Sequence, residues 1–414
     1  MDLTKKVRLY PNKVMSTILD NLCDYRRYCW NQALDVWMSL YQQRQEHLPA
    51  DLRLRVKQAI KDKSITFTDD ESALLMQYPA PTYYTVRKML TADKQDWQHQ
   101  LSSRALYLAV DDLAKAWKYF FNNKDNTSSR AGKPTFRQKK NPKQGFKTDR
   151  IRIQNGKLVL DKPHQYKGDW YGISFKGYSL PDGHIKYCSI TKINNKYYAS
   201  LVVETPIEPL VKTGQHTAVD ANVNHFDYTD GQYSINPKRL NALYEQIAFY
   251  QKRLARKRKV NGKKASDSKS YTVMRAKLQA LYEKATAIQY DLLHKFTTYL
   301  YRTYDIIVIE DLDVKSMQMS KKAKNLHRSL FGKFRLQMEY KAIKFDKQLI
   351  LADRYYASTQ MCSQCGHIKK GDDKITLMGN AKHGTAHNEY ICYNCGYKAD
   401  RDTNAVNNLL ALIK

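Results

Sequence analysis

The hydrophobic pattern changes its period along the chain. Residues 4–10 alternate between polar and apolar side chains, which predicts a strand. From about residue 14 to residue 124, apolar side chains recur every three or four positions, as at Leu106, Val110 and Leu113. This spacing predicts a helical region, because it gathers the apolar side chains on one face of each helix.

From residue 133 to residue 210 the period falls to two. Two alternating runs, 151–160 and 189–203, are each interrupted by a turn-forming pair, Asn155-Gly156 and Asn194-Asn195. Such pairs favour the two-residue turns that join antiparallel strands. We therefore expect a small antiparallel barrel in this region.

From residue 215 onward, strands and helices are mixed. We expect a hairpin first, then two long helices, a buried strand, a helix, a strand and a last short helix. Their expected ranges are 216–235, 238–258, 270–303, 305–309, 328–347, 348–354 and 403–412.

The composition excludes several classes of protein. A chain of 414 residues predicts about two to four domains. Its 12% aromatic content is too high for a chain that is disordered throughout. No run approaches the roughly 18 apolar residues of a membrane-spanning helix, and the first ten residues lack the pattern of a secretion signal. We therefore expect a cytoplasmic protein.

The charge balance indicates a polyanionic partner. Lys and Arg number 70 and Asp and Glu 40, which gives a formal net charge of +30. Such a charge opposes a compact fold unless a polyanion neutralises it, and nucleic acid is the usual one. An anionic membrane surface is the alternative, but we find no basic amphipathic helix with bulky apolar side chains opposite.

Four of the seven cysteines form two closely spaced pairs. Each pair, Cys362/Cys365 and Cys392/Cys395, is followed directly by a glycine. A gap of two residues lets both sulfurs reach one tetrahedral ion, and the glycine permits the tight turn. The pattern predicts a four-cysteine zinc site with a 26-residue spacer that loops out. Two disulfides are the alternative, which a cytoplasmic location disfavours.

The role of this zinc site stays open at the level of sequence. It can contact nucleic acid, or it can only stabilise the fold. We do not expect the three histidines of the spacer to be ligands: His367, His383 and His387. We expect the other cysteines to be ordinary core residues: Cys23, Cys29 and Cys188.

Three acidic residues stand where a strand ends or a helix begins: Asp220, Glu310 and Asp402. A carboxylate directly after a buried strand is costly unless it binds a ligand or caps a helix. Carboxylates that converge on one sheet edge bind pairs of Mg²⁺ ions, which stabilise the attacking and leaving oxygens of phosphodiester hydrolysis. The structural alternatives are that Asp400 or Asp402 caps the last helix and that Asp220 is a turn residue. Together, the set favours a ribonuclease H-like metal nuclease.

Several motifs give the chain a family resemblance. They are Arg8–Lys13, Gly132–Arg137, Ala218–Asp220, His294–Phe296, Tyr304–Leu312, Ser358–Gly366, Cys392–Gly396 and Asp400–Ala405. With these motifs the chain resembles TnpB, the RNA-guided nuclease encoded by insertion-sequence transposons and related to the type V CRISPR effectors. The resemblance runs from residue 8 to residue 405 and is more specific in the C-terminal half.

This resemblance implies a multidomain α+β fold. A helical recognition lobe lies on an OB-like β-barrel wedge domain, and an RNase H-like RuvC nuclease domain follows, with an inserted four-cysteine zinc ribbon. The implied ranges are 1–13 for the first strand of the wedge barrel, 14–124 for the recognition lobe, 125–212 for the wedge barrel, 213–355 for the RuvC domain, 356–398 for the zinc-ribbon target-nucleic-acid-binding insert and 399–414 for the RuvC C-terminal helix.

The resemblance also implies the cofactors and the site residues. Asp220 bridges two Mg²⁺ ions, and Glu310 and Asp402 each hold one side, so that the ions activate water and neutralise the leaving 3′-oxygen. One Zn²⁺ ion is held by the four paired cysteines: Cys362, Cys365, Cys392 and Cys395.

Two positions near this triad need comment. Asp402 is preferred to Asp400 because the third acid of the family precedes an x-Asn pair, here Thr403-Asn404, and Asp311 is expected to be structural. The first motif of the family usually continues Asp-x-Gly, whereas this chain has Ala221-Asn222 after the aspartate. Asparagine tolerates positive φ better than other non-glycine residues, so the turn can survive.

Guide RNA and target DNA are the implied partners. Residues 133–150 carry seven positive charges and one negative, and residues 252–264 carry eight positive charges and no negative. Both suit contacts to phosphates, with a solvated basic face as the alternative. Pro81–Lys88 suits a reader of the motif beside the target, with ordinary helix surface as the alternative. The expected contact residues are Tyr83, Tyr84, Thr85, Arg87, Lys88, Lys133, Arg137, Lys139, Lys140, Arg253, Arg256, Lys257, Arg258 and Lys259.

The sequence therefore predicts a metal-dependent, RNA-guided DNA endonuclease of the TnpB type that cleaves beside a short adjacent motif. The alternatives are a compact type V CRISPR effector with a CRISPR-derived guide, a nuclease-inactive RNA-guided DNA-binding repressor, and a transposon accessory protein that binds DNA without a guide. We expect a monomer in the prokaryotic cytoplasm that is associated with the nucleoid when bound to DNA and does not bind membranes.

Overall fold

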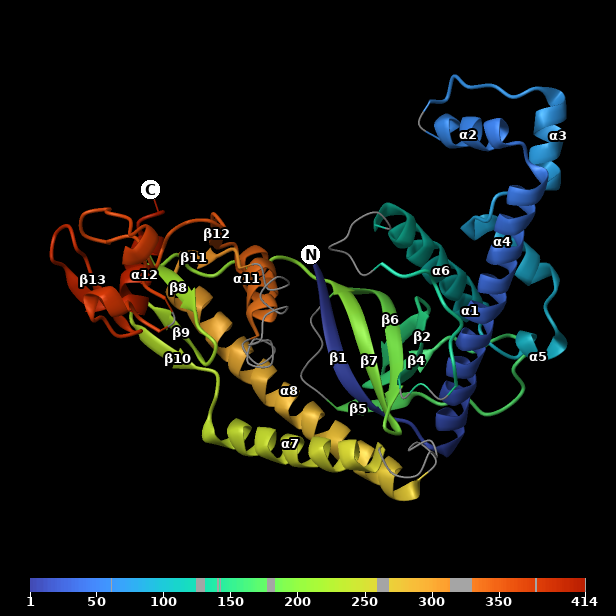
Figure 1. The fold of residues 1–414 in the computed structure, drawn as a ribbon. Coiled ribbons are helices and arrows are strands. Elements are labelled where there is room, and N and C mark those ends of the chain that lie inside the picture. The colour runs from blue at the N-terminus through green and yellow to red at the C-terminus, as the bar shows by residue number, and fades with distance from the viewer. Residues whose placement is uncertain are drawn as a thin grey trace. The chain divides into compact units, whose positions relative to one another are not determined.

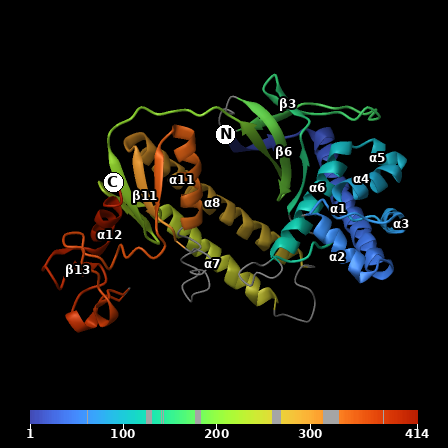
Figure 2. The same cartoon turned by 90° about the horizontal axis from the view of Figure 1, so that it is seen from above.

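The chain divides into two units, Asp2–Thr205 and Pro206–Lys414, which are described separately (Figures 1 and 2). The structure is a computed structural model. It describes residues 1–60, 62–123, 131–139, 141, 143–176, 183–258, 268–312, 330–376 and 378–413.

The first unit begins with the strand β1 (Asp2–Tyr10), followed by a series of helices, as the hydrophobic pattern predicts. The longest is α1 (Lys13–His47), whose first turn is capped by the Asn12 side chain, which accepts a hydrogen bond from the Met15 N–H at 2.8 Å. The other helices are α2 (Ala50–Ala59), α3 (Asp69–Gln77), α4 (Tyr83–Ala92), α5 (Asp96–His99) and α6 (Ser103–Asn123). The buried faces of α1, α4 and α6 share one core around Leu34, Val86 and Leu106.

Seven strands of this unit form one antiparallel sheet in the order β2-β6-β7-β1-β5-β4-β3. Both predicted tight turns are present, with positive φ at Asn155, Gly156, Asn194 and Asn195. The strands after β1 are β2 (Lys143–Thr148), β3 (Ile151–Gln154), β4 (Lys157–Leu160), β5 (Ile173–Lys176), β6 (His184–Ile193) and β7 (Lys196–Glu204).

This sheet is not a closed barrel within the described residues. Its two edge strands, β2 and β3, are separated by only two residues of chain, so the sheet must curl until its edges are near each other. No ladder of hydrogen bonds joins these edges in the described part of the chain. The predicted barrel is therefore a curled, open sheet, and one of its faces packs on Ile18, Leu19 and Leu22 of α1.

The second unit contains a five-stranded mixed sheet in the order β10-β9-β8-β11-β12. Strands β8, β11 and β12 are parallel, and β9 and β10 continue antiparallel from β8. Their ranges are β8 (His216–Ala221), β9 (His225–Tyr228), β10 (Gly231–Ser234), β11 (Ile306–Glu310) and β12 (Gln348–Ala352). Two further short strands, β13 (Glu389–Ile391) and β14 (Lys398–Asp400), pair with each other in the cysteine-rich segment.

One prediction for this unit is corrected. The region 216–235 was expected to be a single hairpin, but it forms three strands with an additional turn at Asn222–Asn224. The Asn222 N–H donates to the His225 carbonyl oxygen at 3.0 Å and closes this turn. The sequence interpretation allowed for a turn at Asn222 but assigned no separate strand after it, and Asn222 forms this turn without the positive φ considered there.

Helices cover the two faces of the mixed sheet separately. They are α8 (Lys269–Thr303), α11 (Phe331–Phe345) and α12 (Arg401–Leu410), whereas α7 (Lys238–Arg258) packs on α8. Val219, Ile307 and Ile309 pack on α8 and α11, whereas Ala218 and Val308 pack on α12. None of the described helices is long and apolar enough to cross a membrane.

A buried ion pair supports the start of β11. The Asp305 carboxylate accepts hydrogen bonds from the Lys347 ammonium and from the backbone N–H groups of Thr213 and Gly214. The Lys347 side chain is fully buried. Burial alone raises the pKa of Asp305, but these hydrogen bonds outweigh it and hold the pKa below its ordinary value.

We predict that Asp305→Asn destabilises the protein by about 3 kcal/mol, because Lys347 then stays buried opposite a neutral group. The melting temperature, followed by circular dichroism, should fall by about 6–12 °C. Since the pKa of Asp305 is lowered by folding, the stabilisation exists above pH ~4 and is lost as the pH falls further. The difference in melting temperature between variant and parent should therefore shrink below that pH.

The control is Asp291→Asn, which breaks the exposed ion pair with Lys295. It should change the melting temperature little. An equal fall in melting temperature for both variants would contradict this account.

Candidate functional site

Two of the predicted site residues end neighbouring parallel strands. In the ladder between β8 and β11, Val219 lies opposite Ile309, and the next residues are Asp220 and Glu310. Because side chains alternate along a strand, both carboxylates share the sheet face that α12 covers. Asp220 is only 6% exposed, so its carboxylate lies deep in this face.

The third predicted residue lies in the first turn of α12. The Asp400 side chain is the cap of this helix and accepts hydrogen bonds from the N–H groups of Asp402 at 2.9 Å and Thr403 at 3.1 Å. The capping alternative therefore applies to Asp400. The Asp402 carboxylate instead accepts from the Arg401 guanidinium at 3.0 Å and faces β9.

The carboxylates influence one another electrostatically. Burial raises the pKa of Asp220 well above its ordinary value, and the charges of Glu310, Asp402 and Asp227 raise it further. Burial also raises the pKa of Glu310, against the effect of a hydrogen bond donated by the Ser358 hydroxyl at 2.5 Å. Gathered carboxylates with few cationic neighbours offer the hard oxygen donors that Mg²⁺ prefers. The donor set thus fits a divalent cation, and the ligand role of the triad stays a prediction.

The structure adds two residues that the sequence interpretation missed. His225 and Asp227 lie on β9, and their donor atoms and a carboxylate oxygen of Asp402 all lie within 4.8 Å of one another. Asp227 is also directly opposite Asp220 in the β8–β9 ladder. In the sequence, His225 and Asp227 alternate with Phe226, whose side chain faces the core. This alternation indicates that the two polar side chains share the opposite face, but only once residues 225–228 are recognised as a strand.

The four paired cysteines gather as predicted. The Sγ atoms of Cys362 and Cys395 are 3.7 Å apart, and those of Cys365 and Cys392 are 3.6 Å apart. A tetrahedral ion with Zn–S bonds of ~2.3 Å separates its sulfurs by about 3.8 Å, whereas a disulfide needs about 2.05 Å. The arrangement therefore suits a shared metal ion and not two disulfides.

The two cysteine pairs have the same backbone geometry. In each pair, the glycine N–H donates to the first cysteine's carbonyl oxygen, at 2.9 Å for Gly366 and 3.0 Å for Gly396. Both glycines have positive φ, of 73° and 75°, which is why a residue without Cβ follows each pair. His383 stacks on Tyr393 and pairs with Asp373, and it is not among the donors grouped with the sulfurs.

Two buried asparagines join the cysteine segment to α12. Asn404 donates from Nδ2 to the Met361 carbonyl oxygen at 2.7 Å, and its Oδ1 accepts from the Ser363 N–H at 3.0 Å. Asn408 donates to the carbonyl oxygens of Ser358 and Met361, both at 2.7 Å. Since α12 also carries Asp402, the cysteine cluster and the acidic site are mechanically connected.

The residues expected to be structural have structural partners. The Asp311 carboxylate pairs with the guanidinium groups of Arg335 and Arg354. Burial raises the pKa of the thiols of the three remaining cysteines to about 12, so they are inert core residues: Cys23, Cys29 and Cys188.

The side chains on α4 that were expected to contact nucleic acid differ in exposure and in their partners within the protein. Tyr84 and Lys88 are exposed on this helix. Arg87 instead donates to the Tyr83 hydroxyl at 3.2 Å and lies over the Tyr107 ring at 4.8 Å, so its guanidinium is already engaged within the protein. Thr85 is half-buried, and its hydroxyl contacts that of Thr82.

The basic stretch around residue 137 borders an open pocket of about 440 Å³ between α1 and the strands β2 and β6. Arg137 stacks on Trp30 at 3.6 Å, Lys139 pairs with Asp24 at 3.2 Å, and Lys133 is exposed. The pocket is lined by five basic side chains, among others: Arg26, Arg27, Arg137, Lys143 and Lys147.

On α7, Arg253 and Arg256 are exposed, and Lys257 donates to the Ser270 hydroxyl at 3.0 Å. Lys140, Lys259 and the side chain of Arg258 lie outside the described residues. The exposure and the partners of these side chains do not test whether they contact nucleic acid, so the expected contacts stay predictions.

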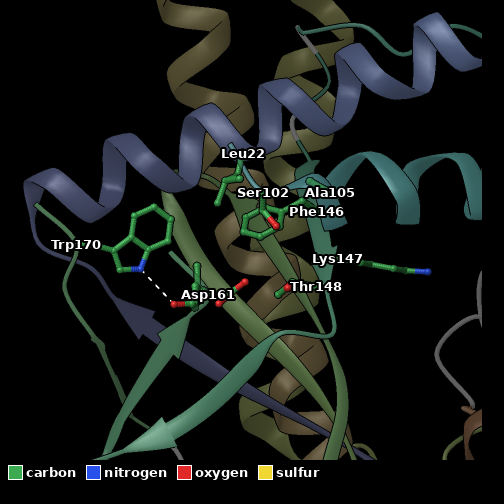
Figure 3. Close-up of a pocket in the computed structure, with 9 residues that line it drawn as sticks. Leu22, Ser102, Ala105, Phe146, Lys147, Thr148, Asp161 and Trp170 are labelled. Carbon is green, nitrogen blue, oxygen red and sulfur yellow. Dashed lines mark hydrogen bonds between the residues drawn. The ribbon is translucent and has the colours of Figure 1, made fainter. Parts of the chain in front are cut away.

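A second, much smaller pocket lies beside α1 in the first unit (Figure 3). Leu22, Phe146 and Trp170 contribute to its lining, and the Trp170 indole N–H donates to the Leu160 carbonyl oxygen at 3.3 Å. Its volume of about 10 Å³ is close to the space of one water molecule. It is therefore too small for a substrate.

Carboxylates gathered at the ends of neighbouring strands are typical of enzymes that act on phosphodiesters through bound metal ions. Comparison with known proteins gives relatives that are named as nucleases. Three family models match the chain: "Probable transposase" over residues 200–321, "Cas12f1-like, TNB domain" over residues 331–409 and "Helix-turn-helix domain" over residues 1–46. In the last range the structure contains β1 and the single uninterrupted helix α1 rather than two helices joined by a turn.

Individual relatives carry related names. A "Putative RNA-guided DNA endonuclease" from Streptomyces pristinaespiralis is 27% identical over 321 residues, which span 75% of this chain and 72% of the relative. "TnpB-like protein L79" of Acanthamoeba polyphaga mimivirus is 30% identical over 142 residues, or 32% of this chain and 24% of the relative. A solved Cas12f1-sgRNA-target DNA complex gives a TM-score of 0.47 at 13% identity, over 99% of this chain and 98% of that one. The sequence matches confirm the resemblance to TnpB.

We predict that Asn404→Ala loosens the first cysteine pair, because it removes the acceptor of the Ser363 N–H and one of the two amide donors to the Met361 carbonyl oxygen, at a cost of about 2 kcal/mol. Hydrogen–deuterium exchange of peptides covering residues 358–366 should become faster. The matched control is Asn407→Ala on the exposed side of the same helix, which gains the same helix propensity and should leave this exchange unchanged. Equal exchange in the two variants would show that Asn404 does not hold the segment.

Proposed function

We propose that this protein is an RNA-guided DNA endonuclease of the TnpB type. The single observation that carries the proposal is that Asp220 and Glu310 end neighbouring parallel strands on the sheet face covered by α12, the helix that carries Asp402. The similarity to relatives named as RNA-guided DNA endonucleases supports it. A binder without nuclease activity has no need of buried carboxylates in this arrangement.

In this proposal the three carboxylates hold two Mg²⁺ ions in a RuvC-type site. When bound, the ions activate water and neutralise the leaving 3′-oxygen of a DNA phosphodiester. Asp220 is buried at the end of the middle strand of the sheet, β8, and would be the carboxylate that both ions share. The Ser358 hydroxyl orients Glu310, and Arg401 orients Asp402.

The cysteine cluster holds one Zn²⁺ ion in the same proposal. Four thiolates with sulfurs 3.6–3.7 Å apart suit zinc, which prefers tetrahedral sulfur ligands. The buried apolar cluster of the cysteine-rich segment is small, so a bound ion would supply much of its stability. The cluster consists of Cys362, Ile375, Tyr390 and Cys392.

Guide RNA and target DNA neutralise the net charge of +30. The first unit presents basic side chains in the open pocket beside α1, and α7 of the second unit presents Arg253 and Arg256. Contacts of this kind hold the phosphate backbone of a guide–target duplex and leave sequence recognition to base pairing. The protein would act in the cytoplasm, on the DNA of the nucleoid.

We predict that the purified protein carries one defined RNA species, with a structured segment that ends in a variable guide. Sequencing of the co-purified RNA checks this, and the structured segment distinguishes a transposon end from a CRISPR repeat. A broad mixture of host RNA fragments would contradict the guided function and favour a DNA-binding protein that uses no guide.

We also predict that Asp220→Ala abolishes DNA cleavage without loss of RNA binding. Removal of a direct metal ligand should slow cleavage by more than about 100-fold, the upper range for loss of a residue that only orients a ligand. The assay uses Mg²⁺ and a DNA target matched to the guide. Asp291→Ala, at an exposed position of α8, is the control and should cleave normally. Full activity of Asp220→Ala would disprove the site.

A further inference from the structure

The acidic site contains a nitrogen donor that the proposed triad does not use. His225 Nε2 lies 3.0 Å from Asp227 Oδ2 and 3.9 Å from Asp402 Oδ2. The three side chains come from β9 and α12, so strand and helix approach each other at this point. Their side chains are 15–28% exposed, which leaves them accessible to an ion.

The fold holds these side chains in place from several directions. His225 and Asp227 are two residues apart on β9 and therefore lie on the same face of the sheet. Both oxygens of Asp227 accept hydrogen bonds, from the Asn222 amide at 2.9 Å and from the Gln232 amide at 3.0 Å. Metal ligands are commonly oriented by such neighbouring donors.

The charges around the site are unbalanced. Asp220 interacts with three other carboxylates, those of Glu310, Asp402 and Asp227, and with one opposing guanidinium, that of Arg401. Four carboxyl groups therefore lie around one guanidinium. A site rich in carboxylate oxygens suits a divalent cation.

The two distances from His225 agree with ligands around one six-coordinate ion. For metal–ligand bonds of about 2.1 Å, neighbouring ligands lie about 3.0 Å apart and opposite ligands about 4.2 Å apart. The distances from His225 Nε2 to the two aspartates, 3.0 and 3.9 Å, fall within this range. An imidazole nitrogen favours a first-row transition ion, whereas Mg²⁺ prefers oxygen ligands.

We propose that His225 and Asp227 are additional metal ligands of this site and that, with Asp402, they make it bind Mn²⁺ in preference to Mg²⁺. This inference rests on the proposed nuclease function in so far as Asp402 is shared with the triad. The mixed nitrogen and oxygen set defines the class of ion: a six-coordinate transition-metal cation.

The test is pulsed electron paramagnetic resonance of Mn²⁺ bound to the full-length protein with its co-purified RNA. The protein is labelled with ¹⁵N-histidine, so that a ¹⁵N coupling reports a histidine ligand and not a nucleobase. A hundredfold excess of Mg²⁺ occupies the phosphates of the RNA. We expect the coupling in the parent protein and its loss in His225→Gln.

Two further variants sharpen the result. Asp227→Asn keeps the size of the side chain and should weaken Mn²⁺ binding by at least tenfold. His216→Gln is the matched control, because His216 is an exposed histidine at the start of the adjacent strand β8, and it should keep the coupling. Melting temperatures of all variants verify that each is folded.

Two outcomes would overturn the inference: no ¹⁵N coupling in the parent protein at saturating Mn²⁺, or an unchanged coupling in His225→Gln. Cleavage assays separate this result from the proposed function. Guided cleavage that Asp220→Ala abolishes, without any histidine coupling, removes only the role of His225 and Asp227. A histidine coupling without guided cleavage supports the metal ligands and removes the proposed function.

Discussion

The parallel pairing of β8 with β11 is the constraint on which the second unit depends. Because parallel strands end at the same edge of a sheet, it brings Asp220 and Glu310 together from positions 90 residues apart in the chain. The connection between the strands must cross over the sheet, and the long helices α7 and α8 lie within it. The alternation of side chains then assigns Val219, Ile307 and Ile309 to the core under α8 and α11, so that the carboxylates lie on the other face.

The opposite face of the sheet carries both apolar side chains and the two carboxylates, so the helix that packs on it must present both apolar and polar side chains. Helix α12 has such a mixed surface, in which Val406 and Leu409 bury Ala218 and Val308, and Asp402 extends over the edge of the sheet. The position of α12 depends in turn on Asn404 and Asn408, which bind the backbone of the cysteine segment. A metal held by the cysteines would therefore stabilise the acidic site without touching it, by fixing the helix that carries one of its carboxylates.

In the first unit, the first strand of the chain lies in the interior of the sheet, between β7 and β5. Strand β1 pairs with β7 on one side and with β5 on the other. The complete sheet therefore requires pairing between the first ten residues and strands that come more than 160 residues later in the chain. Helix α1 follows directly and packs on the face of this sheet, while its later turns pack on α4 and α6. The same helix thereby serves two cores, and the basic pocket lies along it where the helix meets β2 and β6.

The amino-acid sequence by itself determined the local features: the helices and most strands, the Asn155-Gly156 and Asn194-Asn195 turns, and the two cysteine pairs, because periodicity and turn-forming residues act over a few positions. The assignment of Asp400 as the cap needed the position of the helix start, and the grouping of His225 and Asp227 with Asp402 needed β9 to be recognised as a strand of its own. The openness of the first sheet and the approach of His225 to Asp402 were decided only by tertiary structure. Both depend on how segments far apart in the chain pack together, and no short-range pattern encodes the distance between a strand and a helix that are about 175 residues apart.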